Sequence, residues 1–128
     1  MYEDGSGIIV FGMTPNEFFQ VASQMRWSCT PKSAPNEFGS VECGKLHFGF
    51  MQNTLGAFYV SNKSFQTDRG LQVGDSVKKM KQLYGSDFGY DNADDMDMYW
   101  YTLPNEFELN ITANENSGII VEWGMALP

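Results

Sequence analysis

The sequence predicts an α+β fold of two tandem units, each with one helix packed on one face of an antiparallel meander. A short apolar run that ends in glycine and leads through a capping residue into an amphipathic segment occurs at Gly12 and again at Gly74, 62 residues later. The capping residues Thr14 and Ser76 keep the same spacing, and alternating segments follow both helices. We therefore expect repeats at residues 1–66 and 67–128, fused into one compact unit.

The first unit opens with a predicted strand at Ile8–Phe11, because the run is β-branched and ends at a glycine. Thr14 is a typical helix N-cap, and Glu17, three residues later, completes a capping box. A helical stripe of apolar residues follows: Phe18, Val21, Ala22 and Met25.

The second unit repeats this order, with a predicted strand at Leu71–Val73 and a cap at Ser76. Gly85 marks the predicted end of the helix. The apolar stripe of this helix consists of Val77, Met80, Leu83 and Tyr84.

Each helix is followed by three segments that we predict to be strands of a meander. They read SVECG, KLHFGFM and GAFYVSN in the first unit, and MYWYTL, FELNITA and GIIVEWGM in the second. Apolar and polar residues alternate along these segments, so each strand has one apolar and one mostly polar face. His47, Glu108 and Asn110 lie on the polar faces.

The net charge of the chain limits the classes of partner that it can bind. Its 16 acidic and 8 basic residues give a formal net charge of −8. An acidic surface repels phosphate backbones and anionic lipids, so we expect no nucleic acid and no membrane insertion, and a protein with basic character as partner. No spanning run or signal peptide is visible, so the protein is cytosolic or its leader has been removed.

Cys29 and Cys43 are the two cysteines. A disulfide between them would close a polar loop, contribute about 3 kcal/mol and imply an oxidising compartment. The composition is equally compatible with two reduced thiols in a cytosolic protein. A metal site is not predicted, because only His47 could join them and no CxxC spacing exists. We expect no cofactor.

Catalysis finds little support in the sequence. His47 is the single histidine, and no base–nucleophile spacing surrounds it, so we do not expect an enzyme. The acidic segment at residues 87–101 lacks the glycine and glutamate of an EF-hand loop. Its acidic part, up to Asp97, is expected to be a solvated loop between helix and strand.

Large aromatic residues follow the acidic part. Trp100 points to the opposite face from Tyr99 and Tyr101, so rings occupy both faces of this strand. Tyr59 and Trp123, on the last strands of their units, are expected on the open face with Trp100. These rings either pack the core or bind a partner. The predicted partner-binding residues are Tyr59, Trp100, Trp123, His47, Glu108 and Asn110.

The motifs FGMT at Phe11–Thr14, FGF at Phe48–Phe50 and VGDS at Val73–Ser76, with a cysteine after the first helix and another on the following strand, resemble the β-lactamase inhibitory protein family. The resemblance implies a secreted tandem-repeat inhibitor fold, a Cys29–Cys43 disulfide and an aromatic binding surface on the open sheet face. The family's acidic insertion hairpin has no counterpart here, since only GKL separates Cys43 from HFGF.

Three functions remain as hypotheses. The first is a non-catalytic protein-binding module of the secreted or envelope compartment. The second is an envelope assembly lipoprotein domain, because the strand–glycine–cap–helix unit is also similar to the small outer-membrane lipoproteins of the BamE type. The third is a hydrolase built on the acidic segment, with His47 or Asp94 in its site.

Overall fold

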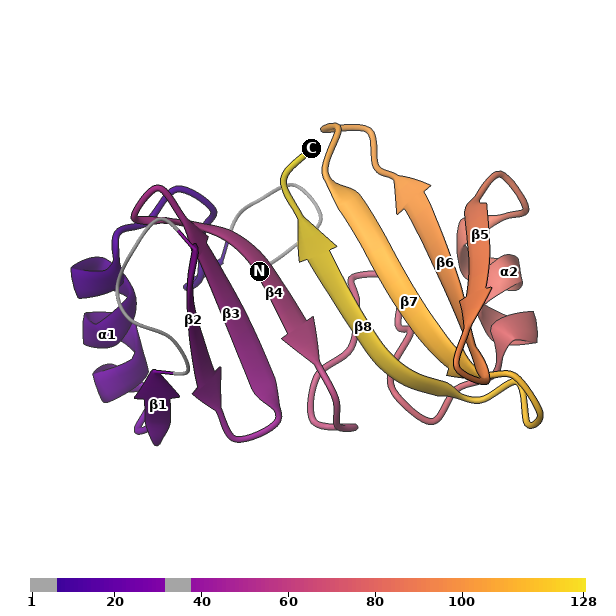
Figure 1. Ribbon diagram of the computed structural model, residues 1–128, viewed down its shortest axis with the longest axis horizontal. Coiled ribbons are helices and arrows are strands. Elements are labelled where there is room, and N and C mark those ends of the chain that lie inside the picture. Colours follow the sequence, from indigo (N-terminus) through magenta and orange to yellow (C-terminus); the bar gives the residue numbers. More distant parts are fainter. Residues whose placement is uncertain (1–6, 32–37) are drawn as a thin grey trace.

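The computed structural model describes residues 7–31 and 38–128 and shows one antiparallel sheet with two short helices (Figure 1). The strands are β1 (Cys29–Pro31), β2 (Phe38–Cys43), β3 (Leu46–Met51), β4 (Thr54–Val60), β5 (Gly89–Ala93), β6 (Met96–Thr102), β7 (Glu108–Asn114) and β8 (Ile120–Ala126). Their order in the sheet is β1-β2-β3-β4-β8-β7-β6-β5. The helices are α1 (Pro15–Gln24) and α2 (Val77–Tyr84), and in the described residues none is long and apolar enough to cross a membrane.

The strand order corrects the predicted fold class. β4 and β8 pair in the middle of the sheet, from Ala57 opposite Ala126 to Val60 opposite Trp123. The prediction of two tandem helix-plus-meander units is therefore wrong, because the chain forms mostly one eight-stranded sheet and the helices supply only 10 and 8 residues. The alternation of apolar and polar residues shows which face of a strand is buried. It does not show which other strand pairs with its free edge. The predicted boundary after residue 66 lies in the segment between β4 and α2.

The two predicted helix starts are confirmed. Thr14 caps α1, since its Oγ1 accepts the Glu17 N–H at 3.3 Å while the Glu17 carboxylate accepts the Thr14 N–H at 3.0 Å. Ser76 caps α2 by accepting the Lys79 N–H at 3.1 Å. Gly85 ends α2 with a φ of +90°, a backbone conformation that glycine adopts without strain. These short-range signals fix the helix boundaries.

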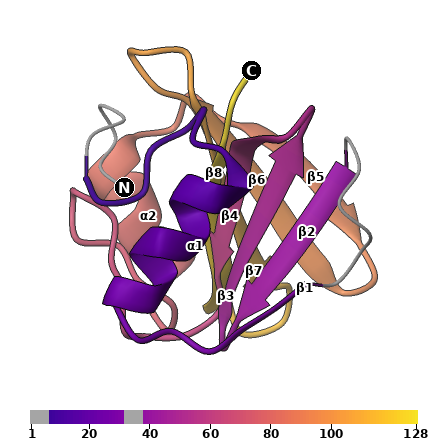
Figure 2. The ribbon, with the colours of Figure 1, turned by 90° about the vertical axis from the view of Figure 1, so that its left-hand side faces the viewer.

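Both helices lie on the same face of the sheet (Figure 2). In α1 the buried Phe18 packs against Phe48 of β3, with ring centroids 4.6 Å apart. In α2 the Tyr84 ring packs against Tyr101 of β6 at 5.5 Å, and the Tyr101 hydroxyl donates to the Gly85 carbonyl at 2.8 Å. The core therefore lies between the helices and one face of the sheet, and among residues 7–31 and 38–128 no helix covers the opposite face.

Two predicted strands are absent from the structure. Residues 8–11 form bends and a turn, and residues 71–73 form only an isolated bridge and a turn. Each segment buries a single apolar side chain, Ile9 at 4% exposure and Leu71 at 0%, without joining the ladder of the sheet. Short apolar runs mark burial more reliably than they mark strand pairing.

The acidic segment is a hairpin and not the predicted loop. Residues 89–93 form β5, which pairs with β6 through a turn in which Asp94 and Asp95 have φ values of +53° and +64°. Two consecutive residues with positive φ are typical of a type I′ hairpin turn, and aspartate tolerates this conformation. The carboxylates in this segment are therefore spread along an edge strand and its turn.

Candidate binding surface on the open face

One row of paired residues crosses the face that the helices leave uncovered. From β2 to β5 each residue is the Cα partner of the next: Glu42, His47, Tyr59, Gly124, Asn110, Trp100 and Gly89. We call these seven residues the open-face row. Four of the six predicted partner-binding residues belong to it, although the β4–β8 pairing that joins the two halves of the row was not predicted.

The neighbouring row faces the helices and is buried. It runs through Phe48, Phe58, Met125, Leu109 and Tyr101, which are between 0% and 6% exposed. Successive residues on a strand point to opposite faces. The open-face row therefore points away from the core, and so does Glu108, which lies two residues before Asn110 on β7.

Trp123 does not belong to this surface. It is 3% exposed and is opposite Val60 and Ile111, on the helix-covered face. The expectation that it lies beside Tyr59 is wrong, because the β4–β8 register puts Gly124 opposite Tyr59 and turns Trp123 to the core. Its ring packs edge-on against Phe58, with centroids 5.6 Å apart.

Each of the two aromatic rings of the row, Tyr59 and Trp100, lies against a glycine on the next strand. A Cβ built at Gly124 would overlap the Tyr59 ring, and one built at Gly89 would overlap the Trp100 indole. Glycine in a strand permits such a close approach. One side of each ring is thus packed on the sheet backbone, and Trp100 remains 37% exposed.

A depression of about 440 Å³ lies between these two rings. Its lining residues on the open face are Tyr59, Asp91, Met98, Trp100, Asn110, Thr112 and Glu122, and between them lie Tyr99 and Ile111, whose buried side chains turn to the helix-covered face. We call this depression the open-face groove. Asn110 and Thr112 supply hydrogen-bonding groups, while Asp91 and Glu122 supply carboxylates.

The open face is acidic. None of the eight strands contains lysine or arginine. Four carboxylates belong to this face: Glu42 in the row itself, and Asp91, Glu108 and Glu122, each two residues from a row member on its strand. Burial raises the pKa of the Tyr59 phenol, and the charges of Glu122 and Glu108 raise it further.

The carboxylates nearest the row have identifiable contacts. The Ser61 hydroxyl donates to Glu122 Oε2 at 3.1 Å, which orients that carboxylate at the groove. His47 Nδ1 lies 3.7 Å from Glu42 Oε1, so the single histidine of the chain is beside a carboxylate at the β2–β3 end of the row. No group of three or more His, Cys, Asp or Glu side chains among residues 7–31 and 38–128 is placed to hold a metal ion.

On the other side of β5, the Tyr90 hydroxyl donates to Asp97 Oδ1 at 2.6 Å and the Asn92 amide donates to the same oxygen at 2.9 Å. The hydrogen bond to Asp97 raises the pKa of Tyr90 to about 12, and the same bond lowers the pKa of Asp97. Tyr90 is opposite Tyr99, on the strand face that turns away from the groove. This cluster holds the two strands of the hairpin together and leaves Asp91 facing the groove.

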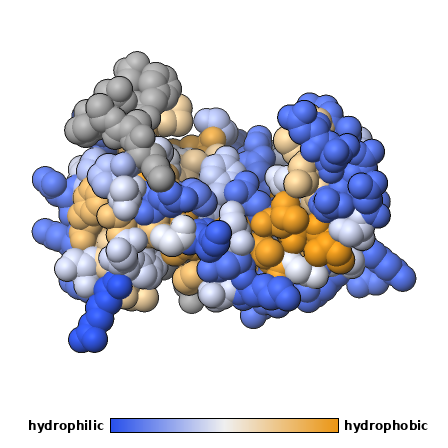
Figure 3. Space-filling model, turned by 60° about the horizontal axis from the view of Figure 1, so that its bottom comes forward, coloured by the Kyte–Doolittle hydropathy of each residue, from blue (hydrophilic) through white to orange (hydrophobic). Residues whose placement is uncertain are grey.

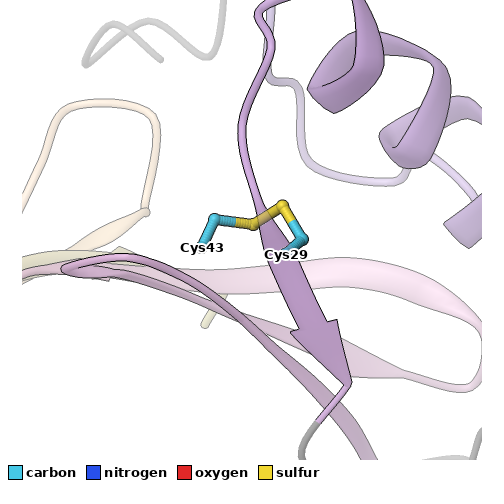
Figure 4. The surroundings of a disulfide bond; sticks show 2 residues. All are labelled: Cys29 and Cys43. Atoms are coloured by element: carbon cyan, nitrogen blue, oxygen red, sulfur yellow. A yellow bond between two sulfur atoms is a disulfide. The ribbon is translucent and has the colours of Figure 1, made fainter.

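The predicted disulfide is present. Cys29 at the start of β1 is bonded to Cys43 at the end of β2, and the two are direct cross-strand partners (Figure 4). The bond ties the edge strand β1 to the sheet. A structural disulfide is typical of proteins from oxidising compartments and is consistent with a secreted protein.

Several groove residues were not predicted to belong to a binding surface: Asp91, Met98, Thr112 and Glu122. Thr112 and Glu122 lie two residues from Asn110 and Gly124, so the period-2 rule would have found them once the strands were placed. Asp91 could not be assigned to this surface, because its segment was interpreted as a loop.

Comparisons with known proteins show a likeness of fold. No protein-family model matches the sequence, and no curated protein matches it. The structure is similar to the crystal structure of an extracellular protein containing a SCP domain from Bacillus anthracis str. Ames, with a TM-score of 0.60 and 6% sequence identity. The match covers 91% of this chain but 43% of that chain.

Proposed function

We propose that this chain is a non-catalytic module that binds a protein partner through the open face of its sheet. The observation that carries the proposal is the open-face groove, which lies between Tyr59 and Trp100 on the face without helices. Large rings offer contact area at a low cost in side-chain entropy and dominate many protein interfaces. Because the rings are packed on glycine backbone, they are already held in place before a partner binds.

The charge of the face supports a partner with basic character. On this face the strands carry four carboxylates and no lysine or arginine, and complementary charge accelerates association and selects among partners. The polar side chains of Asn110 and Thr112 between the rings would satisfy hydrogen bonds of a docked chain. The same charge disfavours nucleic acids and anionic lipids.

The proposed compartment is extracellular or the cell envelope. The Cys29–Cys43 bond supports it, and the structural neighbour is itself described as extracellular. We name no β-lactamase as the partner, because β2 and β3 are joined only by Gly44 and Lys45, which leaves no room for the acidic hairpin of the inhibitor family.

The experiment compares captured proteins for three immobilised forms of the chain: wild type, Trp100→Ala and Phe19→Ala. Phe19 is a matched control, because it is 38% exposed against 37% for Trp100 but belongs to α1 on the opposite face. We expect a protein captured from the extracellular fraction of the source culture to be lost with Trp100→Ala and retained with Phe19→Ala. Equal capture by all three forms, each with an unchanged circular dichroism spectrum, would contradict the proposal.

A further inference from the structure

The surface also carries an apolar patch, and a comparison with this patch shows why the open-face groove is the better candidate for a binding site. Figure 3 shows an apolar patch on the lower side of the molecule, in the half that contains β5–β8. Exposed apolar side chains in this half include Ile119 and Val121, at 38% and 36% exposure. The open-face groove differs from this patch because its lining combines aromatic rings with charge of one sign and with hydrogen-bonding groups.

The groove has the chemistry of a cation site. Two carboxylates, Asp91 and Glu122, line it, and no basic side chain does. The Ser61 hydroxyl holds one oxygen of Glu122 at 3.1 Å and thereby fixes the direction of this carboxylate. A negatively charged and partly enclosed surface lowers the free energy of a cation that binds to it.

The two rings point to the same class of ligand. A Cβ built at Gly89 would overlap Cε2, Nε1 and Cζ2 of Trp100, so the indole lies directly over the glycine. The other side of the indole is available to solvent. Tyr59 lies across Gly124 in the same way at the other end of the groove. An electron-rich ring surface attracts cations, and tryptophan does so most strongly.

The groove is wide enough for a long side chain that contacts one of the two rings. β4 and β6 are three strands apart, which is roughly 14 Å at ~4.8 Å per strand. A planar guanidinium can stack on an aromatic surface while its N–H groups donate in pairs to a carboxylate, whereas an ammonium has neither a flat surface nor a fixed pair of donors. Arginine therefore fits the ring–carboxylate lining better than lysine.

Resting on the proposed function, we infer that the open-face groove takes an arginine side chain of the partner, which stacks on Trp100 or Tyr59 and pairs with the groove carboxylates. Arginine is then the residue of the partner that decides recognition. The other residues of the partner cover the surrounding face and exclude water from this contact.

The test uses three blocked tripeptides, acetyl-Gly-Xaa-Gly-amide, in which Xaa is arginine, lysine or citrulline. Citrulline has the shape of arginine without its charge. Each peptide is titrated into the intact ¹⁵N-labelled protein, and the shifts of the Trp100 indole N–H and of the Asn110 side-chain amide are followed. We expect saturable shifts with arginine, with a Kd about tenfold lower than for citrulline and with lysine between them.

Charge-matched variants separate a groove contact from a general effect of net charge. Glu122→Gln should weaken arginine binding severalfold, whereas Glu115→Gln, which removes the same charge from the exposed β7–β8 turn, should leave it unchanged. Equal Kd values for arginine and citrulline, equal effects of the two glutamine variants, or no saturable shift at all would each overturn the inference.

The capture experiment keeps the two proposals apart. If capture depends on Trp100 while the arginine peptide gives no saturable shift, the arginine inference fails and the protein-binding function stands. If the peptide binds the groove but capture is indifferent to Trp100, the cation site stands and the protein-binding function fails.

Discussion

The packing of Tyr59 on Gly124 allows a sharp prediction, which is that Gly124→Ala destabilises the protein. Replacing a strand glycine by alanine ordinarily stabilises a strand by about 0.5–1 kcal/mol, because alanine loses less backbone entropy on folding. At Gly124 the new methyl group would overlap both the Tyr59 ring and the Phe58 carbonyl oxygen. The ring can rotate away, but the carbonyl belongs to the β4 backbone and can move only by distorting the β4–β8 pairing.

The expected change in the free energy of unfolding is the difference between the entropic gain and the steric cost of the methyl group. Forcing a methyl group into a filled space costs about 1–3 kcal/mol, which exceeds the entropic gain. Because the overlap at Gly124 includes a backbone carbonyl, its cost lies in the upper part of this range, and the net effect is a loss of about 1–2 kcal/mol in the free energy of unfolding. For a chain of 128 residues this lowers Tm by roughly 3–8 °C.

Gly49→Ala is the matched control. Gly49 is also a strand glycine of the open face, but its Cβ position is 3.7 Å from the Ala57 Cβ, an ordinary van der Waals distance. Thermal and urea unfolding followed by circular dichroism should show an unchanged or higher Tm for Gly49→Ala and a lower one for Gly124→Ala. A Gly124→Ala protein as stable as the wild type would refute the close packing of Tyr59 and of the β4–β8 junction.

Three further predictions concern the disulfide, the first helix and the β5–β6 hairpin. Reducing the Cys29–Cys43 bond should add the mass of two hydrogens in mass spectrometry and lower stability by about 3 kcal/mol; a chain whose mass is unaffected by reductant would contradict the bond. Thr14→Ala should cost about 1 kcal/mol through the lost capping box, and an unchanged urea midpoint would speak against that cap. The raised pKa of Tyr90 means that its protonated phenol stabilises the fold below its ordinary pKa of 10.0, and this contribution should disappear as the pH rises to about 12. The lowered pKa of Asp97 gives the opposite dependence, so its contribution is present above the ordinary value of 3.8 and is lost as the pH falls through the lowered pKa. Tyr90→Phe should return the pKa of Asp97 toward that ordinary value in an NMR titration, and an unmoved Asp97 titration would exclude the hydrogen bond as its cause.

The sequence predicted what depends on near neighbours. Thr14, Glu17 and Ser76 set the helix starts through hydrogen bonds that span three residues, so the motif alone determined them. The alternation rule placed Trp100 and Tyr101 on opposite faces of β6, because it too depends only on adjacent residues of one strand.

The sequence did not predict what depends on distant pairing. The neighbours of β4 and β8 are set by packing of the whole sheet, so the continuous eight-stranded arrangement was not predicted and the predicted position of Trp123 was wrong. The edge strand β5 was also missed, because aspartate and asparagine usually mark loops, whereas here pairing with β6 and the hydrogen bonds to Asp97 hold them in a strand. The role of the open face in binding remains a prediction.

The most direct test of that role is photo-crosslinking from each face in turn. A photoreactive phenylalanine derivative is placed at Thr102, which is exposed on β6 two residues from Trp100, or at Gln20, which is exposed on α1. With the captured partner present, the chain should crosslink from position 102 and not from position 20. Crosslinking from position 20 alone would contradict binding through the open face.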